Sequence, residues 1–337
     1  MCKADCTQRK TKPYLPDSVA NMGLAEHSLD LTDVKILSSL LQDSRTSYRS
    51  IGTSVHLTTN AVKSRIIKMI SDGVILGFRM TVDAGVFGFP RTYYVAVKDS
   101  QSPEATANRL GLFGQIITRI ESMGGVTIFE IAVREEQDEE KLESLREALR
   151  PAVVQSITMG HTFPVRLKLG SADYMMMKYL LSDPKMRISE LADRVHLSSK
   201  TAGERLGRMK EDHILRFTVD VDPRRMKGFI KFRVMIRWDG KEGAGAIKEI
   251  RDEMERNFVL SSPFFYEKSV IKCALLARNI FEIDPFLKRI EAREHVLGTE
   301  VFLPSRIETN QNWILREIEK RAGGLQQVKP PQPLGAG

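Results

Sequence analysis

The sequence predicts an α+β protein in which two winged helix-turn-helix domains alternate with two ferredoxin-like α/β sandwich domains. One helical segment, called the cassette below, occurs twice in the sequence. Residues 33–75 align without a gap with residues 173–215, which lie 140 positions later. Each copy is followed by a strand, helix, strand, helix, strand pattern, which is typical of a split βαβ unit. A spacing of 140 residues far exceeds the roughly 20 to 50 residues of a solenoid repeat. Whole units are therefore duplicated.

Composition limits the class of protein. With 337 residues, 42% of them hydrophobic, the chain is long enough for several small domains. No run approaches the roughly eighteen apolar residues of a membrane-spanning helix, and the first residues lack the apolar core of a signal peptide. Three cysteines are too few for a disulfide framework and predict a reducing cytoplasm. The formal net charge of +8 is compatible with nucleic-acid binding.

Each cassette is predicted to form three short helices. In the first copy we expect Thr32 to cap the first helix, Ser47 to open the second and Thr58 to cap the third. Gly73 should end the third helix, before an extended wing-like strand. Helices joined by such a short turn match the helix-turn-helix arrangement, in which the third helix enters the DNA major groove. The apolar stripe that should be buried on this third helix consists of Val62, Ile66 and Met69.

The stretches between and after the cassettes alternate between strand-like and helix-like sequence patterns. In the first copy we predict a strand at 92–98, a helix at 103–120 and a strand at 126–133, followed by a further helix and strand. The second copy gives the same order, from a strand at 229–238 to a last strand at 299–307. A helix near 310–322 and a tail rich in Gly, Pro and Gln should follow, the tail being disordered.

These elements define the predicted domain organisation. The ranges are a flexible tail at 1–28, a first winged helix-turn-helix domain at 29–90, a first α/β domain at 91–169, a second, degenerate winged helix-turn-helix domain at 170–228, a second α/β domain at 229–309, and a C-terminal helix with a disordered tail at 310–337.

The first cassette resembles the N-terminal half of Lrp/AsnC (feast/famine) transcription regulators. The residues that carry the resemblance are the opening LDLTDVKIL, the stretch LQDSR, the helix VKSRIIKM and the turn DGVILGF. The second half resembles the family only through its register with the first. The resemblance implies sequence-specific binding to double-stranded DNA, dimers built through the α/β domains, and a small amino-acid effector held between those domains.

The outward face of the third helix in the first cassette is the candidate DNA-reading surface. Asn can read an adenine edge, Lys can reach guanine or phosphate, and hydroxyls serve either purpose. Arg65 and Arg205 recur at the same place in both copies, and either phosphate contact or pairing with an acidic neighbour explains them. Tyr48 and Arg49 are candidate clamps on the DNA backbone, and Arg79 on the wing is a weaker candidate. The remaining candidates on this helix are Thr59, Asn60, Lys63, Ser64 and Lys68.

The third helix of the second cassette has lost part of this face. Gly203 stands at the position of Lys63, Glu204 at that of Ser64 and Gly207 at that of Ile67. A glycine in a helix interior costs on the order of 1 kcal/mol relative to alanine, and a glutamate has the wrong sign for phosphate. We therefore interpret the second copy as a weaker, more phosphate-directed or structural one. Its usable candidates are Ser199, Lys200, Arg205 and Arg208.

Other polar residues have local interpretations. His56 and His196 are expected to be turn residues, and Cys2 and Cys6 have no nearby partners for a metal site, so no metal or cofactor is predicted. The family's effector loop usually carries a glycine followed closely by an aspartate. The loop here has Gly124, Gly125 and Thr127 but no aspartate. An effector site and a plain turn both remain open.

The favoured function is a DNA-binding transcription regulator that forms a homodimer or an intrachain pseudo-dimer, assembles further, and lies in the cytoplasm on the nucleoid. One alternative is an enzyme that resembles siroheme decarboxylases, with His161 and Arg166 as candidates in the α/β cleft. A second alternative is an interaction-only module.

Overall fold

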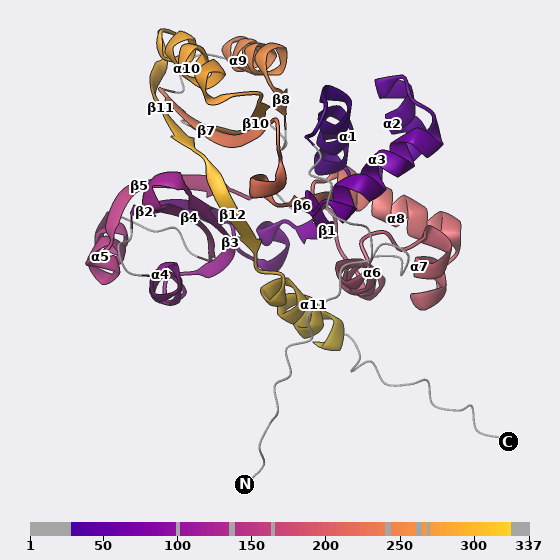
Figure 1. Ribbon diagram of the computed structural model, residues 1–337. Coiled ribbons are helices and arrows are strands. Elements are labelled where there is room, and N and C mark those ends of the chain that lie inside the picture. The colour runs from indigo at the N-terminus through magenta and orange to yellow at the C-terminus, as the bar shows by residue number, and fades with distance from the viewer. Residues whose placement is uncertain are drawn as a thin grey trace, which may run out of the picture.

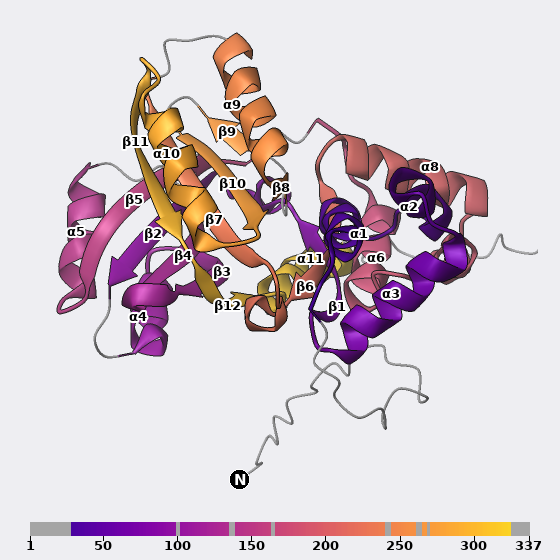
Figure 2. The ribbon, with the colours of Figure 1, turned by 45° about the horizontal axis from the view of Figure 1, so that its top comes forward.

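The computed structural model describes residues 28–98, 102–134, 139–162, 166–239, 244–260, 265–267 and 270–324. Two helix-turn-helix units lie together at one side of the molecule and two helix-covered sheets at the other, as Figures 1 and 2 both show. This is the predicted α+β architecture. Within the described residues, no helix combines the length and apolar character needed to cross a membrane.

The first helix-turn-helix unit contains α1 (Leu31–Gln42), α2 (Tyr48–Val55), α3 (Thr59–Ser71) and the wing strand β1 (Ile75–Val82). Ser47 and Thr58 cap α2 and α3 as predicted, by accepting hydrogen bonds from Ser50 N and Ala61 N at 3.1 and 3.2 Å. The predicted cap Thr32 is wrong. Asp30 caps α1 instead, because its carboxylate accepts from the backbone N–H of residue 33 at 2.7 Å in a capping box.

The second unit repeats this arrangement with α6 (Ser171–Ser182), α7 (Ile188–Arg194), α8 (Ser199–Glu211) and the wing strand β6 (Leu215–Val221). The stripe of α3 is buried as predicted, and α8 buries matching positions. The cores of the two units are separate clusters of buried side chains. The buried residues of the two stripes are Val62, Ile66 and Met69 in α3 and Ala202, Leu206 and Met209 in α8.

The first α/β domain contains β2 (Arg91–Lys98), α4 (Pro103–Leu110), β3 (Gln115–Ser122), β4 (Val126–Val133), α5 (Glu139–Leu149) and β5 (Val153–His161). The predicted helix at 103–120 is wrong beyond Leu110, because its second half is strand β3. Gly114 lies so close to β4 that a Cβ there would be 2.6 Å from Ala132 O, which favours chain reversal at this glycine. The β-branched residues that follow it suit a strand.

The second α/β domain contains β7 (Ile230–Trp238), α9 (Ala244–Asn257), β8 (Val259–Leu260), β9 (Phe265–Glu267), β10 (Val270–Ala277), α10 (Ile283–Glu291) and β11 (Val296–Phe302). Its sheet has the order β11-β7-β10-β8, with β9 also paired to β10. The chain then enters β12 (Pro304–Thr309), which pairs with β3 in the other sheet, ordered β12-β3-β4-β2-β5. The predicted single strand at 299–307 is therefore two strands, which join the two sheets (Figure 1).

Each sheet has one face covered by helices and one face turned toward the other sheet. Alternate residues of β7, such as Phe232 and Val234, pack with the helices α9 and α10. The opposite faces meet through Ala96, Met235 and Phe302, which share one buried cluster. The C-terminal helix α11 (Asn312–Gly324) is close to the predicted one and packs against α6. The predicted tails at 1–27 and 325–337 lie outside the described residues.

Candidate nucleic-acid interface

The polar face predicted on α3 exists as one exposed surface. Its side chains point away from the buried stripe, and the cap by Thr58 leaves the other first-turn N–H groups of α3 free of partners within the helix. These donors and the positive end of the helix dipole favour phosphate. The exposed residues of this face are Thr59, Asn60, Lys63, Ser64 and Lys68.

Arg65 and Arg205 face inward, to carboxylates. Arg65 Nη1 lies 2.7 Å from Asp30 Oδ2 and 2.7 Å from Asp33 Oδ1. Arg205 Nη1 lies 3.0 Å from both carboxylate oxygens of Asp173. The hydrogen bonds that Arg65 donates to Asp33 and Asp30 raise its pKa. Of the two alternatives for these arginines, the structure shows the ion pair, because each one ties the third helix to a buried carboxylate at the start of the first.

The other candidates of the first copy fall in different places. Arg49 is exposed, whereas Tyr48 is half-buried, packs against the core of its unit, and has the ammonium of Lys185 5.5 Å from its ring centre. Burial raises the pKa of Tyr48. Arg79 is mostly buried on the wing and pairs with Asp220 at 3.1 Å, so it does not lie on the α3 surface.

The α8 face combines exposed polar side chains with two glycines. Ser199, Lys200 and Arg208 are exposed, and so is Glu204. The two glycines serve no packing need: a Cβ on Gly207 would meet nothing within 4 Å, and one on Gly203 would meet only Ile188 Cγ2, at 3.9 Å.

His56 and His196 close the turns before α3 and α8. Both adopt left-handed backbone conformations, with φ of 57° and 55°, as a tight turn between helices requires. This agrees with the predicted turn role.

Family comparisons agree with this geometry. An AsnC-type helix-turn-helix domain matches residues 29–70, and a winged helix-turn-helix DNA-binding domain matches residues 171–216. The chain therefore contains an AsnC-type helix-turn-helix domain and a second, winged helix-turn-helix domain.

Similar proteins carry regulator names. The chain is 39% identical over 69 residues to the HTH-type transcriptional regulator Rv2324 of Mycobacterium tuberculosis, covering 20% of this chain and 47% of that protein. It is 25% identical over 105 residues to the regulatory protein AsnC of Haemophilus influenzae, covering 31% of this chain and 70% of that protein. The chain thus spans about half the length of the first of these relatives. A crystal structure of the siroheme decarboxylase NirDL is 17% identical, with a TM-score of 0.46, over 88% of this chain and 100% of that one.

The two wings pair with each other, β1 antiparallel to β6. The register shifts by one residue between Ile75 and Gly77, so the spacing between copies changes from 140 to 139 in the wings. Asp83 and Asp222, which cap matching 3-10 turns, show the new spacing. With it, Arg79 is paired with its own counterpart, Thr218. The pseudo-two-fold axis that relates the copies therefore passes through the Arg79–Thr218 pair.

The loops between the first and second helices of each helix-turn-helix unit exchange the same kind of contact. Arg45 donates to Pro184 O and Met186 O at 2.7 and 2.8 Å. Lys185, which occupies the position of Arg45 in the second copy, donates to Ser44 O at 2.7 Å. Such reciprocal contacts are the signature of an isologous, two-fold interface, here formed within one chain.

The predicted effector loop is an exposed turn between β3 and β4. Gly124 and Gly125 have φ of 82° and 76°, and a Cβ on either would meet nothing within 4 Å. Thr127 is buried in β4. Glycine adopts such positive φ values without steric cost, so both glycines are explained by the turn itself, which is the plain-turn alternative. Of the enzyme candidates, Arg166 is exposed, and the side chain of His161 lies outside the described residues.

Proposed function

We propose that the protein is a sequence-specific transcription regulator in which α3 reads the major groove of double-stranded DNA. The observation that carries this proposal is the exposed face of α3, where Asn60 and Lys63 stand beside a capped helix N-terminus. Asn and Lys at these positions suit base edges, and the helix end suits phosphate.

The second helix, α8, has a different role in this proposal. Lys200 and Arg208 remain available for phosphates, whereas Gly203 and Gly207 remove the side chains that would reach bases. The paired wings and the exchanged loops hold the two helices at a fixed spacing, so one chain supplies the two-fold geometry that a dimer supplies elsewhere. The α/β domains would mediate any further assembly.

The test separates base reading from phosphate contact. Selection from a random duplex library with the full chain would yield a preferred site. Binding of that site and of a scrambled duplex would then be measured by fluorescence anisotropy over a range of salt. We expect Asn60→Ala with Lys63→Ala to abolish the preference, and Lys200→Ala to weaken binding of both duplexes alike and to reduce the salt slope by about one.

Glu211→Gln, an exposed change at the far end of α8, is the matched control and should alter neither quantity. Selection that enriches no duplex, or an unchanged preference in the Asn60/Lys63 variant, would contradict the assignment of α3 as the reading helix.

A further inference from the structure

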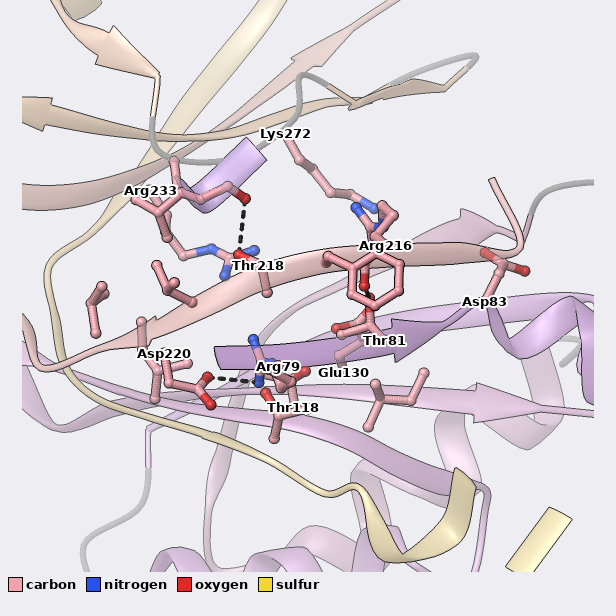
Figure 3. A pocket seen from close by; sticks show the side chains of 18 of the residues that line it. Arg79, Thr81, Asp83, Thr118, Glu130, Arg216, Thr218, Asp220, Arg233 and Lys272 are labelled. Atoms are coloured by element: carbon pink, nitrogen blue, oxygen red, sulfur yellow. Dashed lines mark hydrogen bonds and ion pairs between the residues drawn. The ribbon is translucent and has the colours of Figure 1, made fainter. Parts of the chain in front are cut away.

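A cavity of about 400 Å³ lies where the wings meet the inner faces of the two α/β sheets. The wing strands β1 and β6 form one wall, β7 and β10 a second, and β2, β3 and β4 a third (Figure 3). The side chains used below are those of Arg79, Thr81, Arg216, Thr218 and Asp220 from the wings, Tyr94, Thr118 and Glu130 from the first sheet, and Lys231, Arg233 and Lys272 from the second.

The strand alternation explains why the cations of the second sheet point into this cavity. Lys231 and Arg233 occupy alternate positions of β7, and the residues between them face the helices α9 and α10. Lys272 stands on β10 opposite Met235, on the same face of the sheet. This puts three basic side chains on the inner surface of the sheet, where burial of a charge is costly without a partner of opposite sign.

The acidic side chains that line the cavity are already engaged. Asp220 pairs with Arg79, Glu130 accepts a hydrogen bond from Tyr94 Oη at 2.8 Å, and Asp83 accepts from Gly85 N at 2.8 Å. Neither Lys231 nor Arg233 has an ion-pair carboxylate within the described part of the chain. The buried Nε of Arg79 likewise has no hydrogen-bond partner among the described residues. Donors and positive charge are therefore in excess here.

The cavity lies on the pseudo-two-fold axis, yet its two halves differ. Arg79 and Thr218 are the axial pair, and the 139-residue spacing of the wings continues into the first strand of each sheet, as the alternation of buried residues in β2 and β7 shows. At this spacing Lys231 occupies the position in the second copy that corresponds to Thr92, and Arg233 the position that corresponds to Tyr94. One half offers hydroxyl groups and the other offers cations, which suits a ligand with distinct polar and anionic ends.

We propose that this cavity binds a small organic anion with at least two carboxylate or phosphate groups, held by Lys231, Arg233 and Arg79. The hydroxyl groups of Thr81 and Thr118 would contact the polar end of the ligand. Because β1 and β6 form one wall, an occupied cavity would tie the wings to the α/β domains. This site is separate from the α3 surface and does not depend on the DNA-binding proposal.

The protonation of Lys231 gives the proposal a sharper signature. Burial, with Arg233 and Arg79 nearby, lowers the pKa of Lys231 to about 7, and Asp220 opposes the shift. The other titratable groups of the walls are those of Asp83, Tyr94, Glu130, Arg216, Lys272 and Cys273. An anion beside the amine favours its charged form, so binding at pH 8 should take up a proton.

The experiment is isothermal titration calorimetry of the full chain without DNA. The probes are citrate and inorganic pyrophosphate, with acetate as the monovalent and leucine as the zwitterionic comparison. Titration at pH 8 in two buffers of different ionisation enthalpy reports the protons taken up. We expect citrate or pyrophosphate to bind with proton uptake, and Lys231→Met and Arg233→Gln each to weaken binding at least tenfold, the former also abolishing the uptake.

Arg225→Met removes an exposed cation that does not line the cavity and is the matched control, with no loss expected. Circular dichroism verifies that each variant is folded, and the Asn60/Lys63 variant should bind the anion normally. Absence of binding by either multivalent probe at millimolar concentration would overturn the proposal. So would equal losses in Arg225→Met and Lys231→Met, which indicate general surface charge. Binding of leucine alone would also overturn it, in favour of an amino-acid site.

Discussion

Gly207→Ala is expected to stabilise α8, since this glycine lies in the helix interior without a packing reason. An ideal Cβ there meets nothing within 4 Å, so the substitution causes no clash and gains no contact. The effect is then the backbone term alone, about 1 kcal/mol in favour of alanine. Gly203→Ala should behave similarly, because its Cβ would meet Ile188 Cγ2 at an ordinary 3.9 Å.

Amide hydrogen exchange is the appropriate assay, because a chain of several domains does not unfold in one step and local opening reports the helix itself. A gain of about 1 kcal/mol should slow exchange of the α8 amides roughly fivefold where exchange proceeds by local opening. Gly114→Ala is the control of opposite sign. A Cβ there would lie 2.6 Å from Ala132 O and 2.9 Å from Val133 Cγ1, so exchange in β3 and β4 should accelerate. Unchanged or faster exchange of α8 in Gly207→Ala would refute the view that the glycines loosen this helix.

Two further predictions concern charge. Arg205→Met deprives the buried Asp173 of its guanidinium partner and should lower the free energy of local opening of the second helix-turn-helix unit by about 1 to 3 kcal/mol, visible as faster amide exchange in α6 and α8, whereas Arg208→Met on the exposed side of α8 should change it by less than about 0.5 kcal/mol. Lys231 has a folded-state pKa of about 7, below its unfolded value of roughly 10.4, so the unfolded chain binds more protons between these values and stability should rise with pH by up to about 1.4 kcal/mol per unit. Lys231→Met should remove that slope, and its advantage over the parent chain should be largest below pH 7; a gain equal at pH 7 and pH 10 would contradict the buried-charge explanation.

The repeated cassette was predictable because its signals are local. Capping residues such as Ser47 and Thr58, and an apolar stripe at helical spacing, specify each helix without reference to the rest of the chain. The exposed face of α3 follows directly from that stripe. The role of Arg65 was not decided by the sequence, because a surface arginine and one paired with a buried carboxylate 32 residues away have the same local pattern.

The elements that sequence reasoning missed depend on tertiary contacts. The stretch 115–122 carries apolar residues at spacings that suit a helix as well as a strand, and the close approach of Gly114 to β4 decides in favour of the strand. The division of 299–307 between two sheets has no local signal beyond Pro304. The cavity did leave a local signal: Lys231 and Arg233 alternate with the apolar residues Phe232 and Val234, and this pattern indicates a polar surface on one face of the strand.

Fusion of the two halves into one chain explains why both sites are asymmetric. In a homodimer, every residue near the two-fold axis occurs twice, so Lys231 and Arg233 would face their own copies across a cavity of about 400 Å³. Four cations so placed repel one another strongly in a medium of low dielectric constant. In the fused chain Thr92 and Tyr94 stand at the opposing positions, and the Tyr94 ring lies 3.7 Å from the Lys272 ammonium, a favourable cation–π contact. Because the two halves need not be identical, α8 can carry Gly203 and Gly207 at the positions where α3 carries Lys63 and Ile67. One duplication thereby supplies two-fold geometry for the two helix-turn-helix units and an unequal cavity at the axis between them.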